Sequence, residues 1–244
     1  LNEAAILAAR EDRPVLNMDD LNEAMMKIIA GPAKRSRVQT RRDLKTTAIH
    51  EAGHAVAMYH LPTQDKVLSI TIVPRGQSLG ATWHVPRDDA SNLTRNQMFE
   101  EIVSLLGGRA SEKLTLDDIS TGASSDLQRA TDIARAMITR YGFSEKLGPI
   151  VYGSSENEVF LGRDYGQNKH YSDDIASDID SEIRRLVDEA YEKTESILRE
   201  HRDKLDAVAA VLMEKEKVSG KEFEDIMNPP APVIEETPAE EVSE

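Results

Sequence analysis

The chain of 244 residues and 27.1 kDa is long enough for one large domain with its own core, and no apolar run approaches the roughly 20 residues that cross a membrane. Its 30 basic and 44 acidic residues give a formal net charge of −14, so nucleic acid is not expected as a partner. It contains no cysteine, which excludes disulfides, thiolate metal sites and cysteine nucleophiles, and any metal must be held by histidines and carboxylates.

Two short helices are expected in residues 1–30, separated by a break at residues 12–14. Apolar residues recur at helical spacing in each of them: Leu1, Ala4, Ala5 and Ala8 in the first, and Leu21, Met25, Ile28 and Ile29 in the second. Gly31 and Pro32 end this unit and a basic connector follows, so we place a domain boundary between residues 33 and 34. Because the chain starts without Met inside an amphipathic pattern, we expect further protein upstream.

A longer helix is expected from Thr40 to about Tyr59. Thr40 and Asp43 have the spacing of a capping box at its start, and a proline at position 62 stops it. Residues 67–73 then alternate between apolar and polar in a β-branched run, and residues 79–85 can return as a second strand after a turn. The fold class predicted is therefore mainly α, with a small β-sheet that interrupts the helices.

Helical patterns return at residues 93–114, 124–141 and 172–217, and residues 142–171 are Gly-rich and irregular. The tail at residues 228–244 has four prolines and five acidic residues with no basic one, so it is expected to be disordered. The predicted organisation is thus a helical fragment at residues 1–33, one domain at residues 34–227, and an acidic tail.

The chemistry is concentrated in residues 50–54, with the sequence HEAGH, inside the expected helix over residues 40–59. Residues four apart project from one helix face, so His50 and His54 can bind one Zn²⁺ while Glu51 acts as general base and then acid on a bound water. The alternative is a pair of surface histidines on a solvated helix. Gly53 favours the metal site, because a glycine costs about 1 kcal/mol relative to alanine in a helix interior and indicates a close neighbour.

A catalytic zinc usually has three protein ligands, and the residues alone leave the third one open. His60 is disfavoured because, if the helix continues, its side chain points about 240° away from His54. No glutamate lies between Glu51 and position 100, so the spacing that places a third ligand on the next helix is absent. The remaining candidates are Glu100, Glu101, Glu112 and Asp126, and Asp126 can equally be an ordinary acidic residue of a helix first turn.

Three separated motifs resemble the FtsH family of membrane-anchored AAA zinc metalloproteases: residues 50–54 (HEAGH), 120–126 (STGASSD) and 141–149 (YGFSEKLGP). The resemblance covers about residues 1–227 and implies a helical zinc metalloprotease domain preceded by the end of an AAA lid. It implies that Asp126 is the third zinc ligand beside His50 and His54. It also points to Glu112 as a residue that orients a ligand histidine. The last of the three motifs is expected to form a structural turn near the active site.

The same resemblance implies the larger context of the chain. A phosphate-binding loop is absent from the sequence, so ATP and Mg²⁺ would act only through a missing upstream ATPase domain. Family members are expected to form homo-hexamers, to be held by an N-terminal membrane anchor at the cytoplasmic face of the bacterial membrane, and to degrade unfolded or misassembled membrane and cytosolic proteins.

Two further expectations concern substrate and function. An extended substrate could add to the second strand at Gly80, Ala81 and Thr82, or this strand could simply be paired within the sheet. The rival to the peptidase reading is a catalytically silent helical oligomerisation scaffold of an AAA ring. The long charged helices after residue 172 fit both readings and do not discriminate between them.

Overall fold

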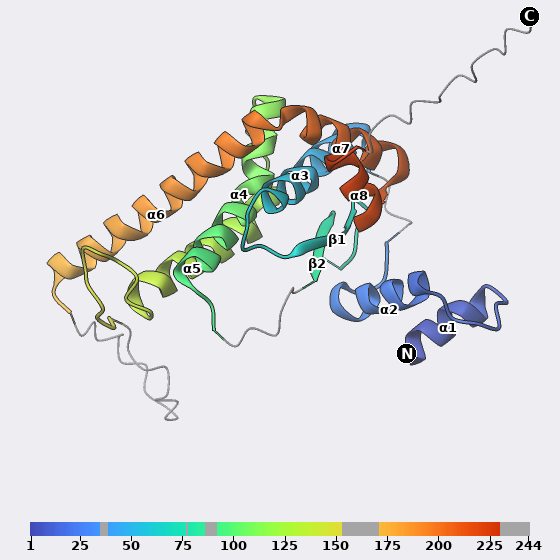
Figure 1. The fold of residues 1–244 in the computed structure, drawn as a ribbon, viewed down its shortest axis with the longest axis horizontal. Coiled ribbons are helices and arrows are strands. Elements are labelled where there is room, and N and C mark those ends of the chain that lie inside the picture. Colours follow the sequence, from blue (N-terminus) through green and yellow to red (C-terminus); the bar gives the residue numbers. More distant parts are fainter. Residues whose placement is uncertain (35–38, 77, 86–91, 153–170, 230–244) are drawn as a thin grey trace, which may run out of the picture.

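The computed structural model describes residues 1–34, 39–76, 78–85, 92–152 and 171–229 of the chain. Within these ranges the fold is mainly helical with a small sheet, as the sequence predicts (Figure 1). The helices are α1 (Asn2–Arg10), α2 (Met18–Ala30), α3 (Arg41–Tyr59), α4 (Arg95–Leu116), α5 (Ser124–Thr139), α6 (Asp173–Glu200), α7 (Arg202–Lys215) and α8 (Gly220–Met227), with a short 3-10 turn at Thr121–Ala123.

The sheet has three antiparallel strands in the order β2-β1-β3: β1 (Lys66–Thr71), β2 (Ala81–Val85) and β3 (Lys217–Ser219). The pairing of β1 with β2 agrees with the predicted pair of strands. The third strand is a difference, because it starts at residue 217, where the expected helical pattern ends, and no strand was predicted there. So short a strand carries no period of its own, and it forms because β1 offers it backbone partners.

Helix α3 begins as predicted, with a reciprocal capping box between Thr40 and Asp43, and ends at Tyr59. It lies near the centre of the molecule in Figure 1. One core joins α3 to the sheet, α7 and α8, and the other joins α4 to α5 and α6. Eleven of the nineteen residues of α3 are buried, so this helix is a central element and not a solvated surface helix.

Glycine and serine let α3 and α4 come unusually close together. A Cβ added at Gly53 would lie 2.3 Å from Ser111 Oγ and 2.4 Å from the carbonyl oxygen of Gly107. Ser111 Oγ also donates a 2.9 Å hydrogen bond to the carbonyl oxygen of Ile49. The close neighbour predicted from Gly53 is therefore the backbone of α4, and the two helices cross at van der Waals contact of their main chains.

The two N-terminal helices form as expected, but the apolar stripe predicted for α2 does not face a core. Its buried residues are Asp20, Ala24 and Met26, whereas Ile28 and Ile29 are 69% and 64% exposed. The helical spacing therefore predicts α2 correctly, while its apolar side chains Ile28 and Ile29 stay exposed in the described part of the chain. The acidic tail from residue 230 and most of the Gly-rich stretch, at residues 153–170, lie outside the described residues.

Within the described ranges, none of the helices combines the length and the apolar character that are needed to span a membrane.

Candidate metal centre

Side chains from two helices converge on one point at the surface of α3. His50 Nε2 and His54 Nε2 lie 3.1 Å apart, and Asp126 Oδ2, from the first turn of α5, lies 3.2 Å from His50 Nε2 and 3.5 Å from His54 Nε2. These three residues are the group of potential metal ligands found among the described residues. The spacing of residues 50 and 54 within one helix therefore produces the pair that the sequence predicts, and the tertiary structure adds Asp126.

The three distances fit a tetrahedral zinc ion. Bonds of about 2.0 to 2.1 Å to nitrogen and oxygen place neighbouring ligand atoms of a regular tetrahedron about 3.3 Å apart. The observed separations of 3.1, 3.2 and 3.5 Å lie around this value. Both histidine nitrogens face each other and the carboxylate, so a cation at their centre satisfies all three groups at once.

The opposite nitrogen of each histidine is held by an acceptor. His54 Nδ1 donates to the carbonyl oxygen of Ser104 over 2.8 Å, and His50 Nδ1 donates to Glu112 Oε1 over 2.7 Å. Because a carbonyl oxygen only accepts, the proton of neutral His54 lies on Nδ1 and its Nε2 carries the free lone pair. The surroundings thus select the tautomer in which both Nε2 atoms can bind a metal.

Glu112 also helps to position the segment that carries Asp126. This carboxylate is buried, and its Oε2 accepts a 2.6 Å hydrogen bond from the backbone nitrogen of Ser120. Ser120 Oγ in turn accepts from the backbone nitrogen of Gly122 in the 3-10 turn that leads into α5. One carboxylate therefore orients His50 and also fixes the segment that presents Asp126.

The fourth functional side chain, Glu51, is buried beside the histidines and is held by β2. Its Oε2 accepts a 2.8 Å hydrogen bond from Thr82 Oγ1, and the same hydroxyl lies 3.1 Å from the carbonyl oxygen of Glu51. Burial raises the pKa of the Glu51 carboxyl, and the two neighbouring imidazoles oppose this effect. The site thus holds a carboxyl group whose proton affinity is tuned by its surroundings, as a general acid and base requires.

The carboxylates around His50 favour its protonated form when no metal is bound. Burial lowers the pKa of His50, but the carboxylates of Asp126 and Glu112 outweigh it and raise that pKa to about 10. The same contacts lower the pKa of Asp126 below its usual range, although its own burial acts in the opposite direction. A cation that binds here must replace this proton, so binding is coupled to pH.

The predicted substrate strand lies directly against Glu51. A Cβ at Gly80 would lie 2.8 Å from Glu51 Oε1, so only glycine leaves room for the carboxylate at this position. Thr82 pairs with Ile70 of β1, and in the described part of the chain β2 pairs with β1 alone, at the edge of the sheet. Gly80 and Thr82 thus both contact Glu51, which is next to the ligand candidate His50 in the chain.

The remaining candidates for a third ligand have other partners. His60 ends α3 and its ring stacks on that of His201, with centroids 3.6 Å apart and planes inclined by 2°. Glu100 accepts hydrogen bonds from the backbone nitrogen and hydroxyl of Thr63, and Glu101 pairs with Arg129. The metal cluster includes none of these three side chains.

The motif at residues 141–149 is a structural turn, but the expectation that it lies near the active site is wrong. It follows the C-terminal end of α5, whereas Asp126 lies in the first turn of that helix. Asp126 lies 13 residues before the end of α5 at Thr139, which at 1.5 Å per residue is about 20 Å along the helix. Ser144 in this turn is buried and donates to Glu182 of α6, so the turn joins α5 to α6.

Two contributors to the site were not found from the sequence. The first is the carbonyl oxygen of Ser104, because any residue has one and no side-chain pattern reveals it. The second is Gly108, where a Cβ would lie 2.3 Å from Cε1 of His50, so the glycine makes room for the ligand ring. The paired glycines at positions 107 and 108 are the signal that could have indicated a close approach.

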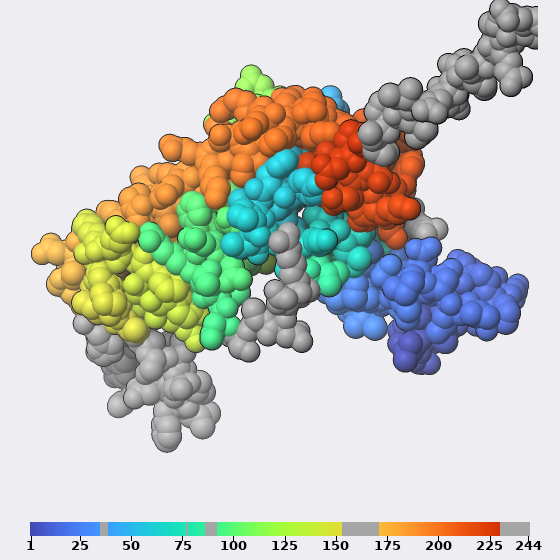
Figure 2. All heavy atoms as spheres, in the orientation of Figure 1, coloured from blue at the N-terminus to red at the C-terminus, as the bar shows by residue number. Residues whose placement is uncertain are grey.

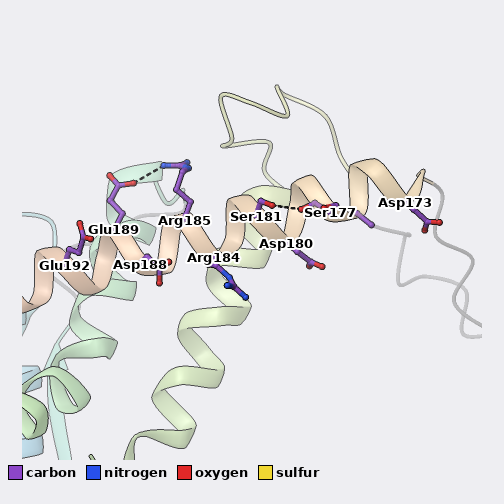
Figure 3. Close-up of a pocket in the computed structure, with 10 residues that line it drawn as sticks. Asp173, Ser177, Asp180, Ser181, Arg184, Arg185, Asp188, Glu189 and Glu192 are labelled. Carbon is purple, nitrogen blue, oxygen red and sulfur yellow. Dashed lines mark hydrogen bonds and ion pairs between the residues drawn. The ribbon is translucent and has the colours of Figure 1, made fainter.

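A separate hollow runs along α6 and is lined by that helix alone, including Asp173, Asp180, Arg184 and Glu192 (Figure 3). Arg185 and Glu189, also drawn there, pair with each other at 3.0 Å. The hollow includes no member of the metal cluster, so it is separate from the site of chemistry.

Comparison with known proteins places this chain in a family. Residues 37–226 match the family described as Peptidase family M41. The chain is 50% identical over 228 residues to ATP-dependent zinc metalloprotease FtsH 1 of Thermoanaerobacter sp. (strain X514), covering 93% of this chain and 37% of that protein. It is 49% identical over 227 residues to ATP-dependent zinc metalloprotease FtsH of Caldicellulosiruptor bescii, with the same coverage. The chain thus spans little more than a third of the length of these relatives.

Proposed function

The chain belongs to peptidase family M41 and is a metalloendopeptidase domain of that family, and from this premise we propose how its residues work and what longer protein it serves. We propose that His50, His54 and Asp126 hold one Zn²⁺, and that Glu51 is the catalytic base. The observation that carries the proposal is the near-equal spacing of the three ligand atoms, with both histidines turned so that Nε2 is free.

When bound, Zn²⁺ supplies Lewis-acid polarisation of the scissile carbonyl and acidifies a water molecule. Glu51 accepts the proton from the attacking water and then donates it to the leaving amine. Thr82 holds the carboxylate of Glu51 in place, and Glu112 keeps the His50 ring in the orientation that binding requires. The proton carrier and the His50 ring are thus held in place before substrate arrives.

The substrate is proposed to bind as an extended polypeptide along β2, with main-chain partners at Gly80, Ala81 and Thr82. Such pairing uses backbone groups that every peptide has and gives little sequence preference. The position of β2 at the edge of the sheet and its contact with Glu51 support this placement. Unfolded chains are therefore the proposed substrates, because only an extended backbone can pair in this way.

The chain is proposed to be the proteolytic part of a longer ATP-dependent, membrane-anchored homo-hexamer at the cytoplasmic face of a bacterial membrane, which degrades unfolded or misassembled proteins. Residues 1–33 would be the end of an AAA lid, residues 34–227 the metalloprotease domain, and residues 228–244 an acidic tail. The relatives named above are called ATP-dependent and are much longer than this chain, which supports an upstream motor. The exposed Ile28 and Ile29 of α2 also support further protein against that helix.

The scaffold alternative is not favoured. A silent oligomerisation module would not need two histidines with selected tautomers, a carboxylate at tetrahedral distance and a buried glutamate beside them. Keeping such groups buried is costly unless they hold a cation or perform chemistry.

The decisive test measures zinc content and cleavage together in three proteins. We expect about one zinc per wild-type chain by elemental analysis, a clear loss in Asp126→Ala, and full zinc in Asp132→Ala, an exposed acid of the same helix. We expect Glu51→Gln to keep its zinc and to lose cleavage of an unstructured protein, because the ligands stay while the proton carrier is lost. Full zinc in Asp126→Ala, or wild-type cleavage by Glu51→Gln, would refute the assigned roles.

A further inference from the structure

We propose that Arg75 is a positioning residue that couples the two N-terminal helices to the catalytic carboxylate Glu51 through the turn between β1 and β2. This inference rests on the proposed function, since it concerns how Glu51 is held. It adds a contact between two parts of the chain that are remote in sequence, and a role for a residue far outside the metal cluster.

The guanidinium of Arg75 is buried against α2. Its Nη2 donates to both carboxylate oxygens of Glu23 over 2.7 Å, and its Nη1 donates to the carbonyl oxygen of Gly31 over 3.3 Å. Although charged, Arg75 is only 7% exposed, while Glu23 is half-buried. Two guanidinium nitrogens contact two different groups, a side chain of α2 and the carbonyl group that follows it, which fixes direction as well as distance, so the turn follows the position of α2.

The backbone adds a second set of contacts at the same place. The nitrogen of Lys34 donates to the carbonyl oxygen of Pro74 over 2.8 Å, and its Nζ reaches the carbonyl oxygen of Gly76 over 2.6 Å. A Cβ at Gly76 would lie 2.9 Å from the carbonyl oxygen of Ala30. Figure 2 shows the blue N-terminal helices touching the rest of the molecule beside the turquoise β1–β2 region. The N-terminal helices are thus joined to the turn by main chain and side chains together.

From this turn the chain leads in a few residues to the active site. Arg75 and Ser78 exchange two backbone hydrogen bonds of 3.1 and 2.8 Å, and the hydroxyl of Ser78 donates to the carbonyl oxygen of Gly80. Gly80 touches Glu51, and Thr82 donates to its carboxylate. A displacement of α2 that moves Arg75 therefore changes where Gly80 and Thr82 hold Glu51. A carboxylate displaced in this way loses its alignment with the scissile bond.

The experiment compares the wild-type chain, zinc-loaded, with Glu23→Gln and Arg75→Gln. Glu23 lies on α2 and contacts the turn through Arg75, so its substitution perturbs the coupling from the far side. The matched control is Lys27→Gln, which breaks the ion pair of Lys27 with Glu3 inside the N-terminal unit and leaves the turn untouched. Amide hydrogen exchange of residues 78–85, the rate of cleavage of an unstructured fluorogenic polypeptide, zinc content and melting temperature are measured for each.

In Glu23→Gln and Arg75→Gln we expect the amide hydrogens of residues 78–85 to exchange about fivefold faster or more than in the wild type. We expect kcat to fall by a similar factor while the zinc content stays unchanged. The double variant Glu23→Gln/Arg75→Gln should lose no more than Arg75→Gln alone, because the two act as one pair. Lys27→Gln should leave both readouts within about twofold of wild type.

A merely structural ion pair would speed exchange in residues 18–34 and leave residues 78–85 and kcat unchanged, and that result would overturn the proposal. If Arg75→Gln fails to fold, the half-exposed Glu23→Gln decides by the same criteria. A wild-type chain that binds zinc and cleaves nothing would count against the proposed function, and the exchange of residues 78–85 would still decide whether the coupling exists.

Discussion

Gly108→Ala tests how closely α4 supports the metal ligand His50. The added Cβ would lie 2.3 Å from Cε1 of the His50 ring, while ordinary contact begins near 3.4 Å, so ring or helix must move by about 1 Å. His50 Nδ1 and Glu112 Oε1 are 2.7 Å apart, and a shift of that size lengthens the bond beyond hydrogen-bonding range. The same shift moves Nε2 away from His54 and Asp126, so the three ligand atoms no longer surround one point.

The expected loss follows from these displacements. Disturbing the partner that orients a ligand typically weakens metal binding about 10- to 100-fold, equivalent to about 1.4 to 2.8 kcal/mol. Overpacking costs about 1 to 3 kcal/mol of folding free energy, which lowers the melting temperature of a domain of this size by about 2 to 12 °C. Zinc affinity should therefore fall even in the protein that remains folded.

The assay is competition for zinc against a chromophoric chelator, with thermal denaturation of the metal-free and zinc-loaded chains alongside. The control is Asn96→Ala, a substitution at an exposed position of the same helix α4. We expect this control to bind zinc within about twofold of wild type. If Gly108→Ala stays folded and also binds zinc within about twofold, the ring is not confined by α4 and the reasoning is wrong.

Three further predictions concern the same site. Glu112→Gln should weaken zinc binding by about 10-fold or more in the chelator assay while the chain stays folded. The neutral amide orients the His50 ring less well and makes its Nε2 a weaker ligand than the carboxylate does. An unchanged zinc affinity would contradict the role of Glu112. The pKa of His50 is raised to about 10, so between pH 6 and 8.5 zinc must displace a proton from this side chain. The zinc affinity should therefore rise with pH, by up to about tenfold per pH unit, in titrations at fixed zinc. An affinity that does not change with pH would contradict this proton displacement. Gly53→Ala should lower the free energy of unfolding, measured in urea, by about 3 kcal/mol or more, because Ser111 and the backbone of α4 leave no space for a Cβ. Equal urea midpoints for the variant and the wild type would disprove the close packing of the two helices.

Local features of the sequence determined much of this protein. The spacing of His50 and His54 places both on one face wherever a helix forms, and the capping box at Thr40 makes that helix start where it does. The β-branched run after it predicts the pairing of β1 with β2, which the structure confirms. Each of these depends on neighbours a few residues apart, and for that reason periodicity and spacing were sufficient.

Only the tertiary structure brought the rest together. Asp126 lies 76 residues beyond His50, and the sequence around it is as typical of an ordinary acidic residue in the first turn of a helix as of a metal ligand. Family resemblance pointed to it, and the folded chain brings it to tetrahedral distance because Glu112 ties the segment before α5 to His50. Helical spacing predicted α2 but could not show that Ile28 and Ile29 stay exposed, since an apolar stripe indicates what a helix can bury and not what lies against it. Long-range contacts depend on how closely elements can approach, and here glycines on α3 and α4 decide that distance.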